Sequence, residues 1–451
     1  MPTATQEQTG LGNYFVANYP PFSAWTAAHV PAALAALNRA PASATPLGLY
    51  LHIPFCRKRC KFCYFRVYTD KNSDDVATYS NALVKEVELY SRTEAVGGRA
   101  LEFVYFGGGT PSYLSATQLG SLMTRLQKLL PWHAAREVTF ECEPGTLQQH
   151  KLATLKELGV TRLSLGIENF KPEILEFNGR AHSEAEIYRA YDWARDLGFD
   201  QINIDLIAGM VGEDWDNWRD CVRKTIRLAP ESVTIYQMEL PYNTTFSKEL
   251  LNHDNPPRDR TPLDLLRPSD IADWPTKRAW VRYAFDELAA AGYERSSAYT
   301  MVHPKRDRRM EFVYRDSLWH GADMFGTGVA SFGHVGGVHM QNEDRWDGYI
   351  GRLLDTGELP LHRALPITHR QRLIREMILQ LKTGRIDAAY FRRKFGVDVL
   401  DEFSDAWRDL ESEGVLSTHD GSVLVTPDGL LQIDRKLPIF FEAEFRGARY
   451  T

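Results

Sequence analysis

The sequence has few cysteines, no long apolar run and no strong net charge. Only five cysteines occur among 451 residues, and this small, odd number suits a reducing compartment better than a disulfide framework. The first residues lack the basic and apolar regions of a secretory signal, and nowhere do about twenty apolar residues follow one another. A formal net charge of -6 gives no general attraction to nucleic acid or anionic lipid. We therefore expect a soluble, cytoplasmic protein without a membrane segment or a nucleic-acid partner.

The chain does contain enough apolar residues for a large core. Hydrophobic residues make up 43% and aromatic residues 12% of it, and its length predicts about two or three domains. From about residue 46 to residue 240, short β-rich runs alternate with longer amphipathic patterns, which predicts parallel βαβ units. We expect strands over 48–53, 101–106, 137–142, 162–167, 201–206 and 232–238. The intervening helices are expected over 75–90, 115–130, 149–158, 184–197 and 215–228. Six such units predict an α/β fold, an open partial (β/α)6 barrel with its chemistry at the C-terminal strand ends.

The pattern changes after about residue 366. Before that point, a helix and strand-like pieces extend the barrel, over 277–292, 293–299 and 325–334. Beyond it, closely spaced helices precede a hairpin, over 370–381, 388–395, 400–413 and 415–427. This order resembles a winged-helix module, and its mixed charges favour a lid or packing domain over a DNA reader. We therefore expect three parts: an N-terminal extension that covers the site (1–44), the core with its β extension (45–350) and a C-terminal helical, winged domain (351–451).

The most informative motif is a loop of three cysteines at CxxxCxxC spacing, directly after the first predicted strand. It contains Cys56, Cys60 and Cys63. Three thiolates on one loop can hold three irons of a 4Fe-4S cluster and leave the fourth iron open for a small ligand. An open iron implies chemistry rather than electron storage. A zinc knuckle is the alternative, but zinc prefers four ligands and the loop offers no fourth thiolate.

A run of three glycines, residues 107–109, stands where the second predicted strand would end, and Thr110 follows it. Consecutive glycines let a backbone approach a ligand closely and expose amide groups that bind polar atoms. Such a run is often only a turn. Its position in the same alternating unit as the cysteine loop favours a ligand cradle.

Several motifs occur in a characteristic order: YLHIPFCRKRCKFC, FGGGTPS, FECEPGT, RLSLGIENF, NGRAH and NIDLIAGM. Their order and spacing resemble those of the radical S-adenosylmethionine (SAM) enzymes of the HemN-like family, which includes oxygen-independent coproporphyrinogen III oxidase. The likeness covers about residues 46–350 and continues more weakly into the C-terminal domain. It implies that the open iron binds SAM, and that one electron cleaves SAM to methionine and a 5'-deoxyadenosyl radical. It also implies a one-electron donor such as flavodoxin or ferredoxin, and we expect a monomer.

The resemblance assigns roles to single residues. The cluster ligands are matched by Cys56, Cys60 and Cys63. The positions that contact the cluster-bound SAM are matched by Tyr50, Phe62, Gly108, Glu141 and, more loosely, Phe332. A carboxylate such as Glu141 at a strand end could pair with an ammonium group or a ribose hydroxyl. Its neighbour Glu143 is interpreted as part of a solvated acidic turn.

The family is unusual in binding a second SAM molecule beside the first. The positions of that second site are matched by Gly109, Thr110, Arg180 and Asp205, and we place Glu168 and Met238 with the cofactor contacts. Of these, Glu168 and Asp205 are the residues expected to take part in catalysis. Asp205 lies inside an apolar strand, where an unpaired carboxylate would be costly. We therefore expect a ligand or a cation such as Arg180 beside it, with a purely structural pair of the two as the alternative.

Three departures from the oxidase pattern bear on the substrate. Phe65 stands where the oxidase has a fourth cysteine, Glu168 stands where the family usually has glutamine, and residues 313–315 offer no glutamine for the second site. These departures favour a radical C-methyltransferase or cyclopropanase. In such an enzyme the deoxyadenosyl radical takes hydrogen from the methyl group of the second SAM, and the methylene radical adds to an sp2 carbon of a conjugated small molecule.

Two other functions remain open. Anaerobic oxidative decarboxylation of coproporphyrinogen III needs cations to meet several propionates, which the N-terminal region and the basic run 305–309 could supply. A haem chaperone of this family would carry a His-Asn-x-x-Tyr-Trp signature, of which this chain offers only Trp319 and His320, in the wrong order. His320 is interpreted as a core histidine, as are His334 and His339.

Overall fold

The computed structural model describes residues 7–41, 45–251, 267–304 and 311–448. Its largest element is a 12-stranded sheet of order β12-β11-β10-β9-β1-β2-β3-β4-β5-β6-β8-β7. The strands β1 to β6 run parallel to one another. They span Leu47–Ile53, Phe103–Gly108, Glu137–Cys142, Arg162–Glu168, Gln201–Ala208 and Ser232–Gln237. The prediction of a partial (β/α)6 barrel is confirmed, with strand ends within two residues of those expected.

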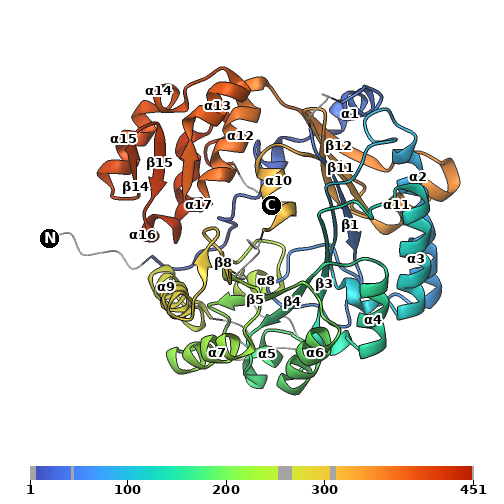
Figure 1. Cartoon of the computed structure of the whole chain (residues 1–451), viewed down its shortest axis with the longest axis horizontal. Coiled ribbons are helices and arrows are strands. Elements are labelled where there is room, and N and C mark those ends of the chain that lie inside the picture. The colour runs from blue at the N-terminus through green and yellow to red at the C-terminus, as the bar shows by residue number, and fades with distance from the viewer. Residues whose placement is uncertain (1–6, 42–44, 252–266, 305–310, 449–451) are drawn as a thin grey trace.

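The helices between these strands cover one face of the curved sheet (Figure 1). They are α2 (Ser73–Ser91), α3 (Ala116–Leu129), α4 (Gln149–Glu157), α6 (Glu184–Asp196) and α7 (Trp215–Leu228). Three of them begin at side chains that cap the free amides of the first turn, namely Asn72, Ser115 and Ser183. Each forms a capping box, so the helix start is encoded locally.

Side chains alternate between the two faces of each strand, and this alternation places the site. On β1, Leu49 and Leu51 face the helices and are fully buried. The intervening Tyr50 and His52 line a cleft on the opposite face. The same period of two holds on the neighbouring strands. It directs a further set of polar side chains to the cleft: Tyr105, Glu141, Ser164, Glu168, Asn203 and Asp205.

Two further groups of strands extend the sheet. β9 (Asp323–Thr327) pairs parallel with β1 on the side away from β2. Beyond it, β10 (Phe332–Val335), β11 (Val338–Asn342) and β12 (Leu361–Pro366) continue antiparallel. At the opposite edge, β8 (Thr300–Val302) and β7 (Glu294–Arg295) follow α9 (Trp274–Ala290). The strand expected over 325–334 is therefore two strands, and the domain boundary predicted at residue 351 precedes the core strand β12.

The C-terminal part forms a second, smaller unit at one side of the barrel (Figure 1). It contains α12 (His369–Leu381), α13 (Ala388–Phe395), α15 (Ser404–Ser412) and a sheet of β13 (Arg385–Asp387), β15 (Ser422–Val425) and β14 (Leu416–His419). The N-terminal segment joins it: Val16 donates its amide hydrogen to Asp434 (2.9 Å), and Lys382 donates to the Val16 carbonyl (2.6 Å). The segment around Tyr14 to Ser23 and the residues from Leu430 to Arg435 therefore both border the cleft.

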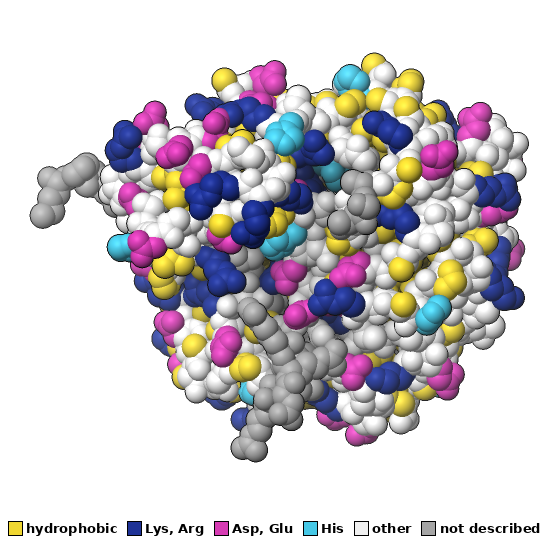
Figure 2. Space-filling model, turned by 45° about the horizontal axis from the view of Figure 1, so that its top comes forward, with side chains coloured by type: hydrophobic (Ala, Val, Ile, Leu, Met, Phe, Trp, Pro, Cys, Tyr) yellow, Lys and Arg dark blue, Asp and Glu magenta, His cyan; other side chains and the backbone are white. Residues whose placement is uncertain are grey.

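The surface and the helices add two observations. In the part of the chain that the structure describes, no helix combines the length and apolarity needed to cross a bilayer. On the face drawn in Figure 2, basic and acidic side chains are interspersed rather than separated into patches of one sign.

A buried carboxylate ties the extended strands to α2. Glu86 accepts hydrogen bonds from the Gly328 amide (2.8 Å), the Asn342 side chain (2.6 Å) and the Tyr349 hydroxyl (2.7 Å). Burial raises the pKa of Glu86 from its usual value of 4.5 to about 8. Between these two pKa values the folded protein binds a proton that the unfolded chain does not, so the free energy of unfolding falls as pH rises through this window.

We therefore expect the cluster-free protein to melt at a lower temperature at about pH 9 than at about pH 6. In the Glu86→Gln variant this decrease is expected to be smaller, because the amide does not titrate. Differential scanning calorimetry across the pH range measures it, with Glu88→Gln on the same helix as the matched control. A Glu86→Gln variant with the same pH slope as the wild type would contradict the assignment.

Candidate active site

A large open cleft lies at the C-terminal ends of the parallel strands and has a volume of about 1220 Å³. Its walls come from the barrel, from the N-terminal segment around Tyr14 and Phe22, and from residues 430–435. The structure brings every residue that the sequence predicts for the site into contact with this cleft. These are Tyr50, Cys56, Cys60, Phe62, Cys63, Gly108, Gly109, Thr110, Glu141, Glu168, Arg180, Asp205, Met238 and Phe332. Their individual roles remain predictions.

The three cysteines lie on the loop that follows β1. The Cys56 amide donates to the Tyr68 carbonyl (3.0 Å), which closes the base of the loop. The Thr110 hydroxyl donates to Cys56 Sγ (3.4 Å). Arg180 Nη1 lies 3.4 Å from Cys60 Sγ. The loop therefore presents three free, half-buried thiols. Each has a hydrogen-bond donor beside its sulfur, since the Phe65 backbone amide serves Cys63.

This donor set fits a 4Fe-4S cluster. Soft thiolates are the ligands that iron-sulfur clusters take, and N–H or O–H groups near the sulfur help to set their potential. Burial raises the pKa of Cys56 to about 11, so bound iron would hold this sulfur as thiolate. Among the described residues, no three His, Cys, Asp or Glu side chains are grouped to hold a single metal ion. Thiolates that each bind a different iron need not converge on one point.

The glycine run packs tightly against the base of the cysteine loop. The Gly109 amide donates to the Ile53 carbonyl and the Thr110 amide to the Phe55 carbonyl, both at 2.8 Å. A Cβ at Gly109 would lie 2.8 Å from the Ile53 carbonyl oxygen. Gly108 has a positive φ of 110°, a conformation that other residues rarely adopt. Glycine is needed here for the close approach of two loops, in addition to any contact with a ligand.

Glu141 is held in place by neutral donors. Its two carboxylate oxygens accept hydrogen bonds from the Tyr105 hydroxyl (2.8 Å) and the Gly108 amide (3.1 Å). Burial raises the pKa of Glu141 to about 7. The Tyr105 ring stacks on Tyr50, with centroids 5.9 Å apart. A fixed carboxylate beside the cysteine loop can accept a hydrogen bond from an ammonium or hydroxyl group of a bound cofactor.

Arg180 links the cysteine loop to the end of β4. Besides its contact with Cys60, it donates to the Gly166 carbonyl and lies 3.9 Å from a carboxylate oxygen of Glu168. Its Nε is buried without a hydrogen-bond partner among the described residues. Burial raises the pKa of Glu168 to about 7, and its backbone has a positive φ of 66°. An unpaired N–H and a carboxylate of raised pKa mark this corner as a place for a polar ligand.

The predicted pairing of Asp205 with Arg180 is wrong, whereas a ligand beside Asp205 stays a prediction. Its carboxylate accepts hydrogen bonds from the Ser164 hydroxyl (2.7 Å) and the Asn203 amide (2.9 Å). Arg180 pairs with Glu168 instead. The register of β4 and β5, which sets Ser164 opposite Asn203, explains the difference. Burial raises the pKa of Asp205, and its partners are neutral groups on the same face of the sheet.

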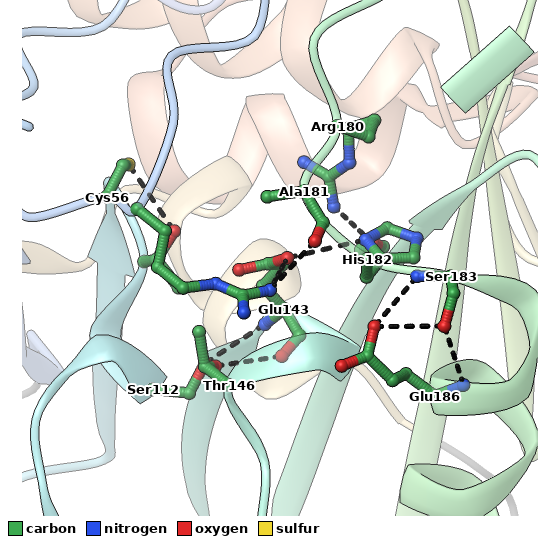
Figure 3. A network of polar contacts seen from close by, with 12 residues as sticks. Cys56, Ser112, Glu143, Thr146, Arg180, Ala181, His182, Ser183 and Glu186 are labelled. Carbon is green, nitrogen blue, oxygen red and sulfur yellow. Dashed lines mark hydrogen bonds and ion pairs between the residues drawn. The ribbon is translucent and has the colours of Figure 1, made fainter. Parts of the chain in front are cut away.

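The interpretation of Glu143 as a solvated turn residue is also wrong. Glu143 is only 7% exposed, and one of its oxygens accepts a hydrogen bond from Arg57 (2.8 Å) with His182 Nδ1 3.6 Å away. Figure 3 shows Glu143 at the centre of a network that also includes Ser112, whose hydroxyl accepts from the Glu143 amide (3.0 Å). Burial alone would raise the pKa of Glu143, but His182 and Arg57 lower it to about 2. The network joins the cysteine loop to the barrel.

Other residues of the cleft were missed or misinterpreted from the sequence. His320 is exposed at the end of α10 (Val313–Trp319) and is not a core residue, whereas His334 and His339 are buried as expected. Tyr14 and Phe22 belong to the N-terminal extension that was expected to cover the site, whereas the wall residues missed from the sequence include Tyr236, Tyr299, Arg315 and Arg435. These residues come from distant segments, so no local motif signals them. The predicted basic run 305–309 lies outside the described residues.

Comparison with known proteins agrees with this architecture. Residues 50–225 match the Radical SAM superfamily, and residues 367–431 match the HemN C-terminal domain. Heme chaperone HemW of Bacillus subtilis is 28% identical over 85% of this chain and 96% of its own length. An oxygen-independent coproporphyrinogen III oxidase of Pseudomonas aeruginosa is 27% identical over 97% of this chain and 92% of its own length. The solved coproporphyrinogen III oxidase (HemN) of Escherichia coli has the same fold, with a TM-score of 0.81 and 22% identity over 96% of this chain and 99% of its own.

These relatives are a chaperone and two oxidases, so they lend no support to the expected methyltransferase branch. The family model and the fold do support the radical SAM chemistry that the three-cysteine loop predicts, including a 4Fe-4S cluster and SAM. A second SAM molecule stays a prediction. With its barrel, its cysteine loop and its C-terminal domain, the chain belongs to the HemN-like family of radical SAM enzymes.

Proposed function

We propose that this radical SAM enzyme acts on a tetrapyrrole that carries carboxylates, and that it converts propionate side chains to vinyl groups by oxidative decarboxylation. The cleft volume of about 1220 Å³ exceeds the ~300–1,000 Å³ of a pocket for one small ligand. This volume supports a cofactor together with a large organic substrate. Oxidative decarboxylation therefore replaces radical C-methylation as the leading candidate function.

The observation that carries the proposal is an incompletely paired arginine in the cleft wall. Arg315 on α10 pairs with Asp316 through both Nε (2.8 Å) and Nη2 (2.7 Å), and Nη2 also donates to Ser296 (2.9 Å). Its Nη1 is buried and has no partner among the described residues, although the side chain is only 9% exposed. Leaving a buried N–H unpaired is costly. A carboxylate of the substrate would satisfy it.

A second arginine that lines the cleft, Arg435, has the same property. The Arg435 guanidinium lies over the rings of Tyr14 (4.7 Å) and Trp274 (4.4 Å), and its Nη1 contacts Glu7 (3.1 Å). Its Nε is buried without a partner among the residues that the structure describes. Two unpaired arginine N–H groups suit a substrate with more than one carboxylate.

The residues of the cleft divide the work of such a reaction. When bound, the cluster and SAM supply a 5'-deoxyadenosyl radical. The aromatic wall around Phe22 and Phe332, whose ring centroids are 4.2 Å apart, would help to exclude water from the cleft. Arg315 holds a carboxylate in position. The overall conversion would move one hydrogen atom from the propionate to the deoxyadenosyl radical, release carbon dioxide and pass one electron to an external one-electron acceptor such as an oxidised ferredoxin or flavodoxin, so that atoms and electrons balance.

The likeness to the oxidases supports this proposal over methylation. The Pseudomonas aeruginosa oxidase aligns with 97% of the chain, so the similarity extends beyond the SAM-binding core. Phe65 remains the observation that favours radical C-methylation as a second candidate. Its ring is 44% exposed, lines the cleft and lies against Tyr64, with centroids 4.5 Å apart. A phenyl ring offers neither the thiol nor the proton that a cysteine would.

Anaerobic reconstitution with iron, sulfide, reductant and SAM separates the candidates. With coproporphyrinogen III as substrate, we expect release of carbon dioxide and formation of vinyl groups. Mass spectrometry detects both products. Transfer of a labelled methyl group with formation of S-adenosylhomocysteine would instead support methylation. Tight haem binding without turnover would support a chaperone, the function named for the Bacillus subtilis relative. Either outcome would reject decarboxylation.

The Arg315→Met variant tests the carboxylate contact. Because a hydrogen bond to a charged group contributes about 1.5–3 kcal/mol, we expect KM for coproporphyrinogen III to rise about 10- to 100-fold with a smaller change in kcat. SAM cleavage without substrate should remain. Arg219→Met, at an exposed position on α7, is the matched control. An unchanged KM would remove Arg315 from the substrate site.

A further inference from the structure

Two histidines face each other across the β10–β11 pair. His334 on β10 and His339 on β11 are directly opposite in the antiparallel register. Their Nδ1 atoms are 3.0 Å apart. Both side chains are buried, but His334 also lines the cleft. Two nitrogens at this distance share one hydrogen, so one ring must donate and the other must accept.

The partners of His339 decide which ring donates. His339 Nε2 lies 3.0 Å from the Tyr19 carbonyl oxygen, and a carbonyl can only accept, so Nε2 carries the hydrogen. Arg375 donates to Asn18 Oδ1 (2.7 Å), which fixes the orientation of that amide. Asn18 Nδ2 then points at His339 Nδ1 (3.4 Å) as a donor. Both contacts make His339 Nδ1 an acceptor.

The consequence for His334 follows from this arrangement. Its Nδ1 must donate to His339, so in the neutral ring the other nitrogen, Nε2, has a lone pair and no hydrogen. No described residue forms a hydrogen bond with Nε2, and this atom is not among the fully buried unpaired atoms. The chain of hydrogen bonds from the Tyr19 carbonyl through His339 to His334 therefore fixes the tautomer of His334. It leaves His334 Nε2 as a free acceptor at the cleft.

The surroundings keep the ring neutral. Burial, and then His339, Arg375, Arg372 and Lys394, lower the pKa of His334 well below its usual value. The nearby acid on α12, Glu376, is held by Lys394 at 2.8 Å. In this tautomer Nδ1 is held by its partner His339, and Nε2 keeps its lone pair. Histidines that bind a ligand through one ring nitrogen commonly have the other nitrogen held in this way.

We infer that His334 is a specificity-determining residue whose Nε2 accepts a hydrogen bond from an N–H group of the substrate. The inference rests on the proposed function for the identity of that substrate, in which the donor is a pyrrole N–H. Apolar and aromatic residues that line the same cleft as His334, namely Met324, Leu318, Trp319 and Phe332, suit the faces of such rings. A lone pair repels carboxylates, so His334 and Arg315 select different groups of one molecule.

The first test is independent of any substrate. Diethyl pyrocarbonate acylates unprotonated imidazole nitrogens, and mass spectrometry locates the product. We expect His334 to react while His339, whose nitrogens are both engaged, does not. The exposed His133 is the control for access of the reagent. Modification of His334 is expected to persist as pH falls from about 7 to about 5, because its pKa lies well below the usual value. If His133 were modified and His334 were not, the assignment of a free acceptor at His334 Nε2 would be wrong.

The second test measures binding of coproporphyrinogen III without oxygen, by quenching of tryptophan fluorescence. We expect His334→Phe to weaken binding about tenfold, and His334→Gln, which keeps an acceptor near the Nε2 position, to restore most of it. Equal binding by wild type and His334→Phe would overturn the inference alone, whereas no binding by wild type would overturn the proposed function as well. If binding depended on His334 only for the iron complex of coproporphyrin, His334 would be a ligand of the iron. This result would also reject the contact with a pyrrole N–H group.

Discussion

Changing Cys60 to alanine is expected to abolish the broad visible absorption of the reconstituted cluster and the reductive cleavage of SAM. Three thiolates are the minimum that leaves a single iron open, and the cysteine loop has no spare thiol. The variant also removes the sulfur that lies 3.4 Å from Arg180. Iron and sulfide content, absorption spectra and the yield of 5'-deoxyadenosine measure the result.

Cys221→Ala is the matched control. Cys221 is buried on α7 and is not among the residues that line the cleft. Its loss should lower the free energy of unfolding by about 1 kcal/mol and leave the iron content unchanged. A Cys60→Ala protein that holds a full cluster and produces 5'-deoxyadenosine would remove Cys60 from the ligand set.

Changing Arg180 to alanine is the second large expected effect. The cluster should still form, but turnover is expected to fall about 100-fold, by analogy with loss of one preorganised donor. Two causes act together. The substitution removes a positive charge and an N–H group beside Cys60, which should lower the reduction potential of the cluster. It also leaves Glu168 without its cation, which should raise the pKa of that carboxyl further.

A redox titration followed by electron paramagnetic resonance separates these causes from misfolding. Arg180→Lys should recover part of the potential because it restores the charge without the fork of donors. Arg189→Ala, at an exposed position on α6, should behave as wild type. Normal potential and normal turnover in Arg180→Ala would show that this arginine is only part of the scaffold.

Much of the barrel could be predicted because its signals are local. The strands β1 to β6 appear in the sequence as short runs between capped amphipathic helices, and their order in the sheet follows the order of the chain. The position of β9 could not be predicted this way. It pairs with β1 from more than 250 residues away, and nothing in its own five residues specifies that neighbour.

The candidate active site likewise combines features that local sequence predicts with features that depend on distant contacts. The cysteines follow one strand and could be recognised by spacing alone. The pairing of polar side chains depends on the register between strands, so Ser164 rather than Arg180 reaches Asp205. The burial of Glu143 could not be predicted from its neighbours in the sequence, because its partner Arg57 lies on a loop 86 positions earlier. The tautomer of His334 depends on a carbonyl and an amide of the N-terminal segment, which no pattern around residue 334 reveals.

The place of β1 between β2 and β9 also has a consequence for biosynthesis. Thr327 on β9 donates its hydroxyl hydrogen to the Tyr50 carbonyl, and these partners are 277 positions apart. On a ribosome that adds about 5–20 residues per second, roughly 14 to 55 s pass between the emergence of the two strands. During this interval β1 is an edge strand that ends in three free thiols, a state open to mispairing and oxidation. If iron loading requires β9 to be paired with β1, it must follow synthesis of the cysteine loop by this delay.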